Sequence, residues 1–275
     1  MRKQLQTAGN PSTYRTDALA APSLPLLAAV ICLLALGVCA ARGPDDASPK
    51  LPFFIGEKLT YDVSLASGAR IGQSTMWVEG PAPVRGTNTY VLRFDSRVRL
   101  ALFTGESKSE SWFDPVRQRS LRYLRRERSI VTRDDILVDM FPEQKRWQAK
   151  DGTSGSSPTD SSLDELSFIF FLRTLPLTPG ANYQFDRHFD QARNPIRVQV
   201  VRREVTATSL GELHTVLVEM RVRDSKHYDG EGLIRLNFTE DDCRLPARIE
   251  STMPVVGKAI MSLRAENAAE ACAKH

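Results

Sequence analysis

Residues 58–65 read Lys-Leu-Thr-Tyr-Asp-Val-Ser-Leu, and every second residue in this stretch is apolar. Leu59, Tyr61, Val63 and Leu65 would share one face, with polar side chains on the other. Because successive side chains of a β-strand point to opposite faces, this alternation predicts a half-buried strand.

A second alternating run follows after a short break. Ser74, Met76 and Val78 continue the period of two, and Gly68 and Gly72 bracket the break. Two such runs joined by a glycine-containing turn predict a β-hairpin.

The same pattern recurs along most of the chain. Further strands are expected around 90–94, 108–113, 119–128, 135–141, 145–149, 183–185, 196–200, 216–222 and 234–238, and in a closing hairpin of 244–251 and 258–264. About a dozen strands joined by short turns favour an antiparallel sheet over a parallel α/β fold. So many twisted strands tend to curl or close.

One segment has helical spacing. Residues 152–162 have a loop composition, and Ser162 and Glu165 have the S-x-x-E spacing of a capping box. Apolar residues then recur with helical spacing until Pro176, where the helix should end. The sequence therefore predicts a mainly antiparallel all-β fold, in which a strongly curved sheet or half-barrel carries one short helix packed on its concave side.

Length and composition agree with a folded domain. The chain has 275 residues, of which 41% are hydrophobic and 25% charged, which argues against a disordered or fibrous protein. No period of 20 to 50 residues repeats, which argues against a propeller or solenoid. We expect a polar linker over 41–52 and a single β-rich domain over 53–275.

The N-terminal region resembles an export signal. Residues 24–38 form a charge-free run of fifteen, short for a membrane span of about 20 residues but suitable for the core of a signal peptide. Small residues precede Ala41, so we expect a signal peptide over 1–40, cleaved between Ala40 and Ala41. The expected location is the periplasm of a Gram-negative-type envelope.

Two alternatives remain for this region. Residues 24–41 could form an uncleaved anchor, because the apolar run stretches to eighteen residues. Residues 36–39, Leu-Gly-Val-Cys, also resemble a lipobox with Cys39 as the lipidated residue, although Val38 departs from the small residue favoured there. The protein would then be a membrane-anchored lipoprotein, and only the anchor or the lipid would contact the membrane.

Two cysteines, Cys243 and Cys272, remain after removal of the signal. An exported chain with two cysteines favours one disulfide. The closing hairpin returns the chain toward Cys243 shortly before Cys272, so the pairing is geometrically reasonable. Its loop of about thirty residues would contribute about 3 kcal/mol in the chain-entropy model. The alternative is two unpaired thiols.

The net charge argues against nucleic acid as a partner. The whole chain has a net charge of +4, and without residues 1–41 there are 34 basic against 32 acidic residues. A near-neutral, exported chain without dense basic clustering is not expected to bind nucleic acid.

No motif in the chain carries recognisable catalytic chemistry. Nucleophilic hydrolysis would favour G-x-S-x-G or S-x-x-K, a zinc site would favour H-E-x-x-H, and a phosphate loop would need its lysine. None is present. Asp134–Asp135 and Asp241–Asp242 are explained by turns. The histidines are scattered singly, at His188, His214, His227 and His275. We assign no catalytic, metal-binding or cofactor-binding residue.

Arginines concentrate in residues 117–133. Arg122, Arg125 and Arg126 could bind an anionic headgroup, because guanidinium groups suit phosphate and carboxylate. The alternative is a charged strand face that discourages edge-to-edge aggregation.

Several aromatic residues could line an apolar ligand cavity. They are Tyr61, Trp77, Trp112, Trp147, Phe168, Phe170 and Phe171, with Tyr61, Trp112 and Phe170 as the main candidates. A curled sheet covered by one short helix need not be filled by its own side chains. The alternative is that these residues fill the core.

Several segments taken together resemble a known family. Residues 55–63, 69–72 and 110–115 are similar to the bacterial exported proteins grouped as DUF3108, a domain of unknown function. Further matching pieces lie at 163–167, 172–173, 176–180 and 242–249. The resemblance implies a Gram-negative periplasmic or envelope location and an antiparallel β fold, and it implies no activity. The plan is also similar to the sheet-plus-helix design of periplasmic lipoprotein carriers, as a fold-level analogy.

These observations favour a non-enzymatic exported envelope protein that binds a hydrophobic or amphiphilic, lipid-like molecule inside the sheet. A structural or protein-interaction module of the envelope, with another envelope protein as its partner, is the first alternative. An envelope hydrolase without a recognisable motif is the second.

Overall fold

The computed structural model describes residues 50–267 except 102, 130–132, 224–229 and 254–256. The predicted signal peptide, with Cys39, Ala40 and Ala41, lies outside the described residues, and so does Cys272. Residues from Ala47 onward belong to one compact unit. No described helix is long and apolar enough to cross a membrane.

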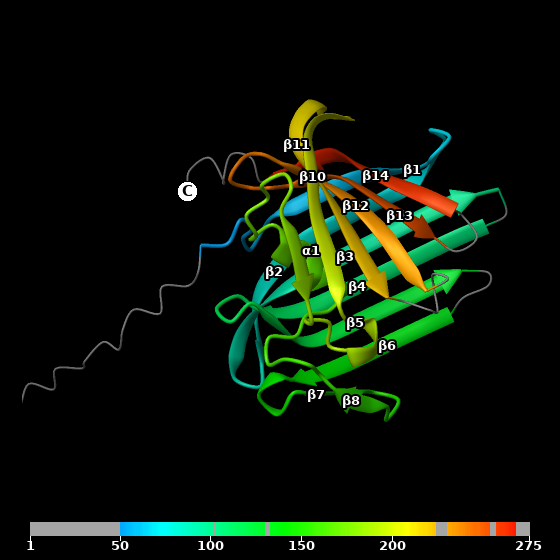
Figure 1. The fold of residues 1–275 in the computed structure, drawn as a ribbon. Coiled ribbons are helices and arrows are strands. Elements are labelled where there is room, and N and C mark those ends of the chain that lie inside the picture. Colours follow the sequence, from blue (N-terminus) through cyan, green and yellow to red (C-terminus); the bar gives the residue numbers. More distant parts are fainter. Residues whose placement is uncertain (1–49, 102, 130–132, 224–229, 254–256, 268–275) are drawn as a thin grey trace, which may run out of the picture. The chain divides into compact units, whose positions relative to one another are not determined.

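The described chain folds into one sheet of fourteen strands in two runs (Figure 1). The first run comprises β1 (Lys58–Leu65), β2 (Arg70–Val84), β3 (Thr87–Leu100), β4 (Phe103–Asp114), β5 (Arg119–Ser129), β6 (Arg133–Phe141), β7 (Arg146–Ala149) and β8 (Ser154–Ser156). The second comprises β9 (Asn182–Phe185), β10 (Ile196–Thr208), β11 (Gly211–Arg223), β12 (Glu231–Thr239), β13 (Pro246–Met253) and β14 (Gly257–Glu266). Short 3-10 turns, η1 (Pro142–Gln144) and η2 (Gln191–Arg193), interrupt the runs.

The two runs are antiparallel meanders joined in the middle of the sheet, where the first strand of the first run pairs with the last strand of the second. The spatial order descends from β8 to β1 and then from β14 to β9, so β1 pairs with β14. In the described part of the chain, β8 and β9 are the edges, and the sheet is not closed. Register shifts within β2, β4 and β10 mark bulges, which increase the local twist.

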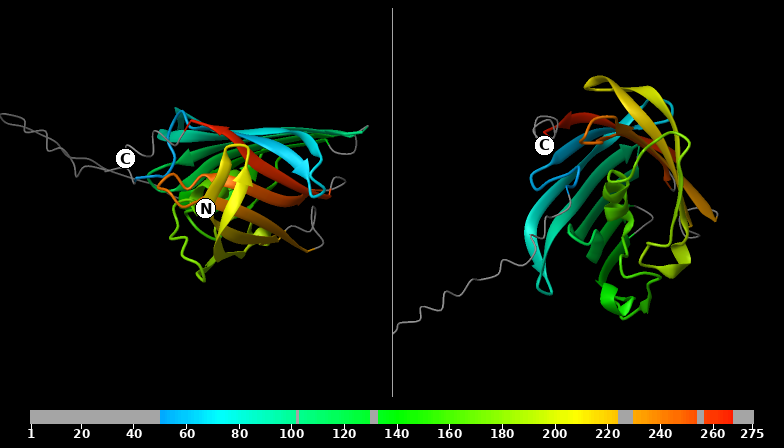
Figure 2. Two further views of the ribbon diagram at one scale, coloured as in Figure 1. Left: turned by 90° about the horizontal axis from the view of Figure 1, so that it is seen from above. Right: turned by 60° about the vertical axis from the view of Figure 1, so that its left-hand side comes forward.

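The single helix, α1 (Glu165–Leu172), links the two edges by crossing the concave side of the sheet. Figure 2 shows it lying between the strands of the two runs. The predicted curved antiparallel sheet with one helix on its concave side is therefore confirmed.

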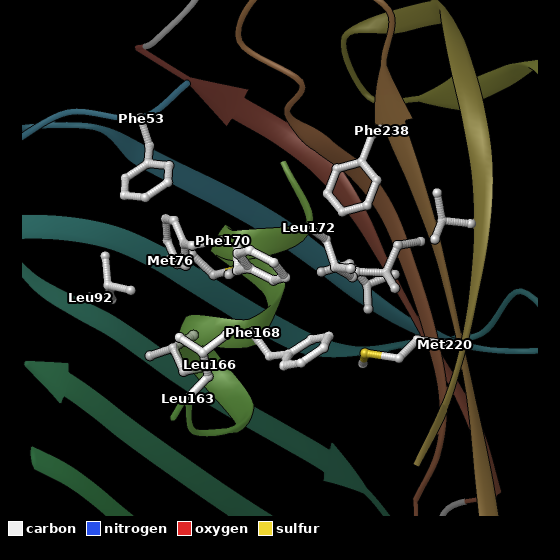
Figure 3. Close-up of a cluster of buried hydrophobic side chains, with 14 of the residues drawn as sticks. Phe53, Met76, Leu92, Leu163, Leu166, Phe168, Phe170, Leu172, Met220 and Phe238 are labelled. Atoms are coloured by element: carbon white, nitrogen blue, oxygen red, sulfur yellow. The ribbon is translucent and has the colours of Figure 1, made fainter. Parts of the chain in front are cut away.

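Both runs pack their inner faces onto α1. Figure 3 shows Phe53, Met76 and Leu92 on one side of the helix and Met220 and Phe238 on the other. All five side chains are buried. The helix has buried residues on most sides, at Leu166, Ser167, Phe168, Phe170, Phe171 and Leu172. It therefore acts as the centre of the core.

The start of α1 differs from the sequence prediction. The N-cap is Asp164, whose Oδ1 accepts hydrogen bonds from the backbone N–H groups of Leu166 (3.0 Å) and Ser167 (2.9 Å). In return, Ser167 Oγ accepts a hydrogen bond from the backbone N–H of Asp164 (3.0 Å), so the capping box is D-x-x-S. Ser162 instead donates to the carbonyl of Thr159. A carboxylate that accepts two backbone N–H groups is the stronger cap.

Two further details were not predicted. The last helical residue is Leu172 and the C-cap is Arg173, so the helix ends before it reaches Pro176. A short strand, β8, lies within the segment predicted as loop, and Gly155 pairs there with Trp147. A strand of only three residues that consists of serine and glycine has no alternating apolar pattern, so the sequence does not predict it.

Candidate binding site on the concave side of the sheet

Residues that pair across neighbouring strands lie on the same face, so the registers define rows on the concave side. One row lies beneath α1 and is buried or half-buried throughout: Val78, Leu92, Ser111, Tyr123, Val138 and Ala149. The next row contains Met76, Phe94, Ser109, Arg125 and Ile136. In this second row Phe94 and Ile136 are only half-buried. The concave face therefore extends beyond the area that the helix covers.

The helix itself has one less buried side. Glu165 and Ile169 are its two half-buried residues. Residues four apart lie on the same face of a helix, so these two side chains form one stripe. On the opposite run of strands, Ile234 and Met261 are also half-buried and pack at the margin of the core. Of these apolar side chains, Ile169 lies one helical turn from the Glu165 carboxylate.

Glu165 is the centre of a charged cluster. Its Oε1 lies 2.7 Å from Arg193 Nη1, 3.5 Å from Arg125 Nη1 and 3.7 Å from His188 Nε2. Burial opposes ionisation of Glu165, but His188, Arg193 and Arg125 outweigh it and hold the pKa well below its usual range. Glu165 is therefore an anion at neutral pH.

Arg125 is held in the same cluster. Its side chain is 9% exposed and lies 3.2 Å from Asp134 Oδ2 and 3.6 Å from Glu127 Oε1. Burial lowers the pKa of the guanidinium, but Glu165 and the other acidic neighbours outweigh burial and raise it above its ordinary value. The cluster therefore contains the cations Arg125 and Arg193 and three carboxylates, and it does not present an excess of positive charge.

Three buried polar atoms in this cluster have no hydrogen-bond partner among the described residues. They are His188 Nε2, Glu165 Oε2 and Arg125 Nε. His188 Nδ1 accepts a hydrogen bond from the backbone N–H of Asp190 (3.0 Å), so Nε2 is assigned as the nitrogen that carries a proton. Buried polar atoms are normally satisfied by protein, water or ligand. The cluster thus offers a donor at His188 and an acceptor at Glu165.

Asp164 supports the cluster from the other side of the helix start. Its Oδ2 accepts from Ser111 Oγ at 2.5 Å, and Ser120 Oγ lies 2.8 Å from Ser167 Oγ. Burial raises the pKa of Asp164 to about 6, and the hydrogen bonds from Ser111, Ser167 and Ser120 limit the rise. These contacts fix the first turn of α1 against β4 and β5, and hence the position of Glu165.

The residues predicted to line an apolar cavity lie in different places. Tyr61 and Phe170 are buried in the main core, and Phe170 packs against Phe53 with ring centroids 5.1 Å apart. Trp112 is half-buried on the outer face, because it pairs with Val91 and Arg122. Tyr61 Oη is also buried and has no hydrogen-bond partner in the described chain.

The three predicted anion-binding arginines divide between the two faces of β5. Arg125 points inward to Glu165, whereas Arg122 points outward, with its Nε 2.8 Å from Asp139 Oδ1 and its guanidinium 5.8 Å from the ring centroid of Trp112. Arg126 is exposed on the outer face and pairs with Asp135 in the sheet. Alternation along a strand separates the neighbours that the sequence places together.

Other residues considered in the sequence are either remote from the cluster or not described by the structure. His214 is exposed, whereas His227 and His275 lie outside the described residues. Cys243 is buried in the core, but its predicted partner Cys272 is not described, so the disulfide stays a prediction. Within the described ranges, no group of three His, Cys, Asp or Glu side chains is arranged to hold a metal ion.

The Glu165 cluster was not predicted from the sequence. Its members come from β5, β6, the start of α1, the loop before η2 and η2 itself, and nothing in their spacing links them. The one local sign in the sequence was Glu165 itself, a charged residue directly after the N-cap Asp164 in a helix whose other residues, except Ser167, are apolar.

The architecture defines a class: an open, β-barrel-like antiparallel sheet wrapped around one helix. A β-barrel-like protein of the DUF1849 domain of unknown function from Brucella abortus has the same fold, with 13% identity, a TM-score of 0.52, and 78% of this chain and 98% of that chain covered. A Bacteroides fragilis protein provisionally described as exported, with a YmcC-like fold, gives 11% identity, coverage of 79% and 98%, and a TM-score of 0.29.

The family assignment follows from a match over residues 60–264 to DUF3108, described as a protein of unknown function. The chain belongs to this family. A comparison with curated proteins finds no match.

Proposed function

We propose that this protein is a non-enzymatic binding protein of the cell envelope that holds an amphiphilic, lipid-like molecule on the concave side of its sheet, beside α1. The observation that carries the proposal is the half-buried apolar margin formed by Phe94, Ile136 and Ile169, which adjoins the Glu165 cluster. Phe94 and Ile136 lie in the same row of the sheet as Arg125, and Ile169 lies one helical turn from Glu165. The apolar N-terminal run supports the envelope location.

The apolar margin supplies the affinity in this proposal. These side chains face inward but remain partly exposed, in contrast to the buried row beneath α1. An acyl chain laid along them would remove apolar surface from water on both partners. Each buried methylene contributes about 0.8 kcal/mol. A chain of moderate length would thus offset the entropy lost on binding.

The polar cluster supplies the headgroup contacts. His188 Nε2–H is a buried donor and Glu165 Oε2 a buried acceptor, and neither has a hydrogen-bond partner among the described residues. A headgroup hydroxyl or ammonium can satisfy one or both atoms, which restores hydrogen bonds otherwise lost on burial. Because carboxylates balance the arginines, a zwitterionic or neutral headgroup fits better than an anionic one.

The proposal is tested by calorimetric titration with lysophosphatidylethanolamine, a zwitterionic single-chain lipid, below its critical micelle concentration. We expect saturable binding with one site, and weaker binding of the anionic lysophosphatidylglycerol. Ile136→Gln should weaken binding about tenfold, since about 1.4 kcal/mol of apolar contact would be lost.

The matched control is Leu137→Gln. Leu137 is the next residue on β6, is also half-buried and lies on the outer face opposite Leu124. It should leave binding unchanged. Absence of binding to the unmodified protein, or equal affinities for the two variants, would overturn the proposal.

A further inference from the structure

The outer face of β1, β2 and β3 carries an open hollow of about 820 Å³. Trp77, Thr75 and Gln73 line it from β2, and Asp95 and Arg97 line it from β3. It lies on the opposite side of the sheet from α1, because Met76 and Val78 alternate with Trp77 and point inward.

Trp77 is the aromatic residue of this hollow, and its orientation is fixed. Its Nε1 donates to Glu79 Oε1 at 2.7 Å, and Glu79 Oε2 lies 2.7 Å from Arg93 Nε. Arg93 is in turn 2.7 Å from Glu110 on the neighbouring strand. The indole is half-buried, so part of its surface faces the hollow while its N–H is occupied. A fixed, partly exposed indole is a platform for an amphipathic ring.

Most charges around Trp77 are paired. The lining contains three cations, Lys58, Arg70 and Arg97, and two carboxylates, Glu79 and Asp95, and Asp62 beside the hollow adds a third carboxylate. Arg70 lies 2.6 Å from Asp62, and Arg97 lies 3.9 Å from Asp95, so opposite charges already face one another. Such a lining gives no strong attraction for an anion or a cation. Its hydroxyl, amide and charged groups can still exchange hydrogen bonds with a neutral polar ligand.

The backbone of this region is not available to a ligand. β1, β2 and β3 are central strands, each paired on both sides. A peptide therefore cannot bind here by adding a strand to an edge. Recognition must use side chains, and the only aromatic group in the lining is Trp77.

We propose that this hollow is a second binding site, specific for a neutral oligosaccharide, in which a sugar ring stacks on Trp77 and its hydroxyls bond to Thr75, Gln73 and Asp95. Sugar rings combine apolar C–H faces with equatorial hydroxyls, which matches an indole surrounded by polar groups. The site is independent of the concave side, so either proposal can fail without the other.

The test is calorimetric titration of the full exported chain with maltotetraose, cellotetraose and chitotetraose. We expect at least one to bind with a dissociation constant of about 10 µM to 1 mM, and Trp77→Ala to weaken that binding at least tenfold. Trp112→Ala is the matched control, because Trp112 is also half-buried on the outer face but lies outside the hollow. It should bind as the unmodified protein does.

A second variant distinguishes loss of the binding site from loss of the fold. Thr75→Arg retains Trp77 but places a long, charged side chain on the floor of the hollow, and it should also abolish binding. Thermal melting establishes that each variant is folded. The proposal is overturned if no tetrasaccharide binds, if Trp77→Ala and Trp112→Ala bind equally, or if Thr75→Arg binds as the unmodified protein does.

Discussion

Arg173 and Glu57 form a bidentate ion pair that is fully buried, with Arg173 Nη1 2.6 Å from Glu57 Oε1 and Nη2 2.8 Å from Oε2. Arg173 Nη2 also donates to the carbonyl of Pro52 (2.6 Å), and Nε donates to that of Cys243 (3.2 Å). One side chain therefore connects the end of α1, the segment before β1 and the loop before β13. It holds the helix, and with it Glu165, in place within the sheet.

Removal of one partner of this pair should be strongly destabilising. Arg173→Met leaves the Glu57 carboxylate buried without its counterion, which costs about 3–5 kcal/mol. Urea unfolding measures the loss. The comparison is Arg197→Ala, which removes an exposed pair with Glu231 and should cost at most about 1 kcal/mol. Similar losses in the two variants would contradict the central role of Arg173.

Gly72 allows β2 and β3 to approach closely. A Cβ at this position would lie 2.0 Å from the carbonyl oxygen of Arg97 and 2.9 Å from Cα of Val98. Both atoms belong to the backbone, so Gly72→Ala should cost about 2–3 kcal/mol or more. Gly86→Ala meets open space but has a positive φ of 82°, and should cost about 1 kcal/mol. Chemical denaturation should rank them in this order, and the reverse order would refute the steric argument.

Asp164 should make stability depend on pH. Its folded-state pKa of about 6 lies above its usual value, because burial favours the protonated form. The folded state then binds more protons than the unfolded state between about pH 4 and pH 6. The stability that protonation provides is complete below about pH 4 and is lost as the pH rises through 6, by about 2–3 kcal/mol.

Asp164→Asn isolates this contribution. Asparagine is also a good N-cap, so the helix start should survive. The difference in unfolding free energy between the unmodified protein and Asp164→Asn should shift by about 2–3 kcal/mol across this pH range, in favour of the variant at higher pH. Urea unfolding at pH 4, 5, 6 and 7 measures it. A difference that does not change with pH would show that Asp164 titrates as an ordinary carboxyl.

The predicted Cys243–Cys272 bond is tested by intact mass. Oxidised protein should weigh about 2 Da less than its reduced form, because pairing removes two hydrogens. Reduction should also lower stability by about 3 kcal/mol in the chain-entropy model. Equal masses before and after reduction would mean that both thiols are free.

The strands were predictable because their pattern is local. The alternation in residues 58–65 corresponds to β1, and the burial of Leu59, Tyr61 and Val63 follows from it directly. The cap of α1 was harder, because S-x-x-E and D-x-x-S overlap in residues 162–167. Only the tertiary contact between Asp164 and Ser111 distinguishes them.

The candidate site was not predictable for a physical reason. Glu165, His188 and Arg125 lie in three segments, and curvature of the sheet brings them together. The arginine-rich stretch was noticed, but the strand directs Arg122 and Arg125 to opposite faces. Composition can reveal a cluster in the sequence, whereas the register decides which members meet.

The most direct test of amphiphile binding on the concave side is native mass spectrometry of the protein, purified without detergent and then mixed with lysophosphatidylethanolamine. The account predicts a one-to-one complex for the unmodified protein and for Leu137→Gln, and a much smaller bound fraction for Ile136→Gln. Only unbound protein at every lipid concentration, or equal occupancy in the two variants, would contradict it.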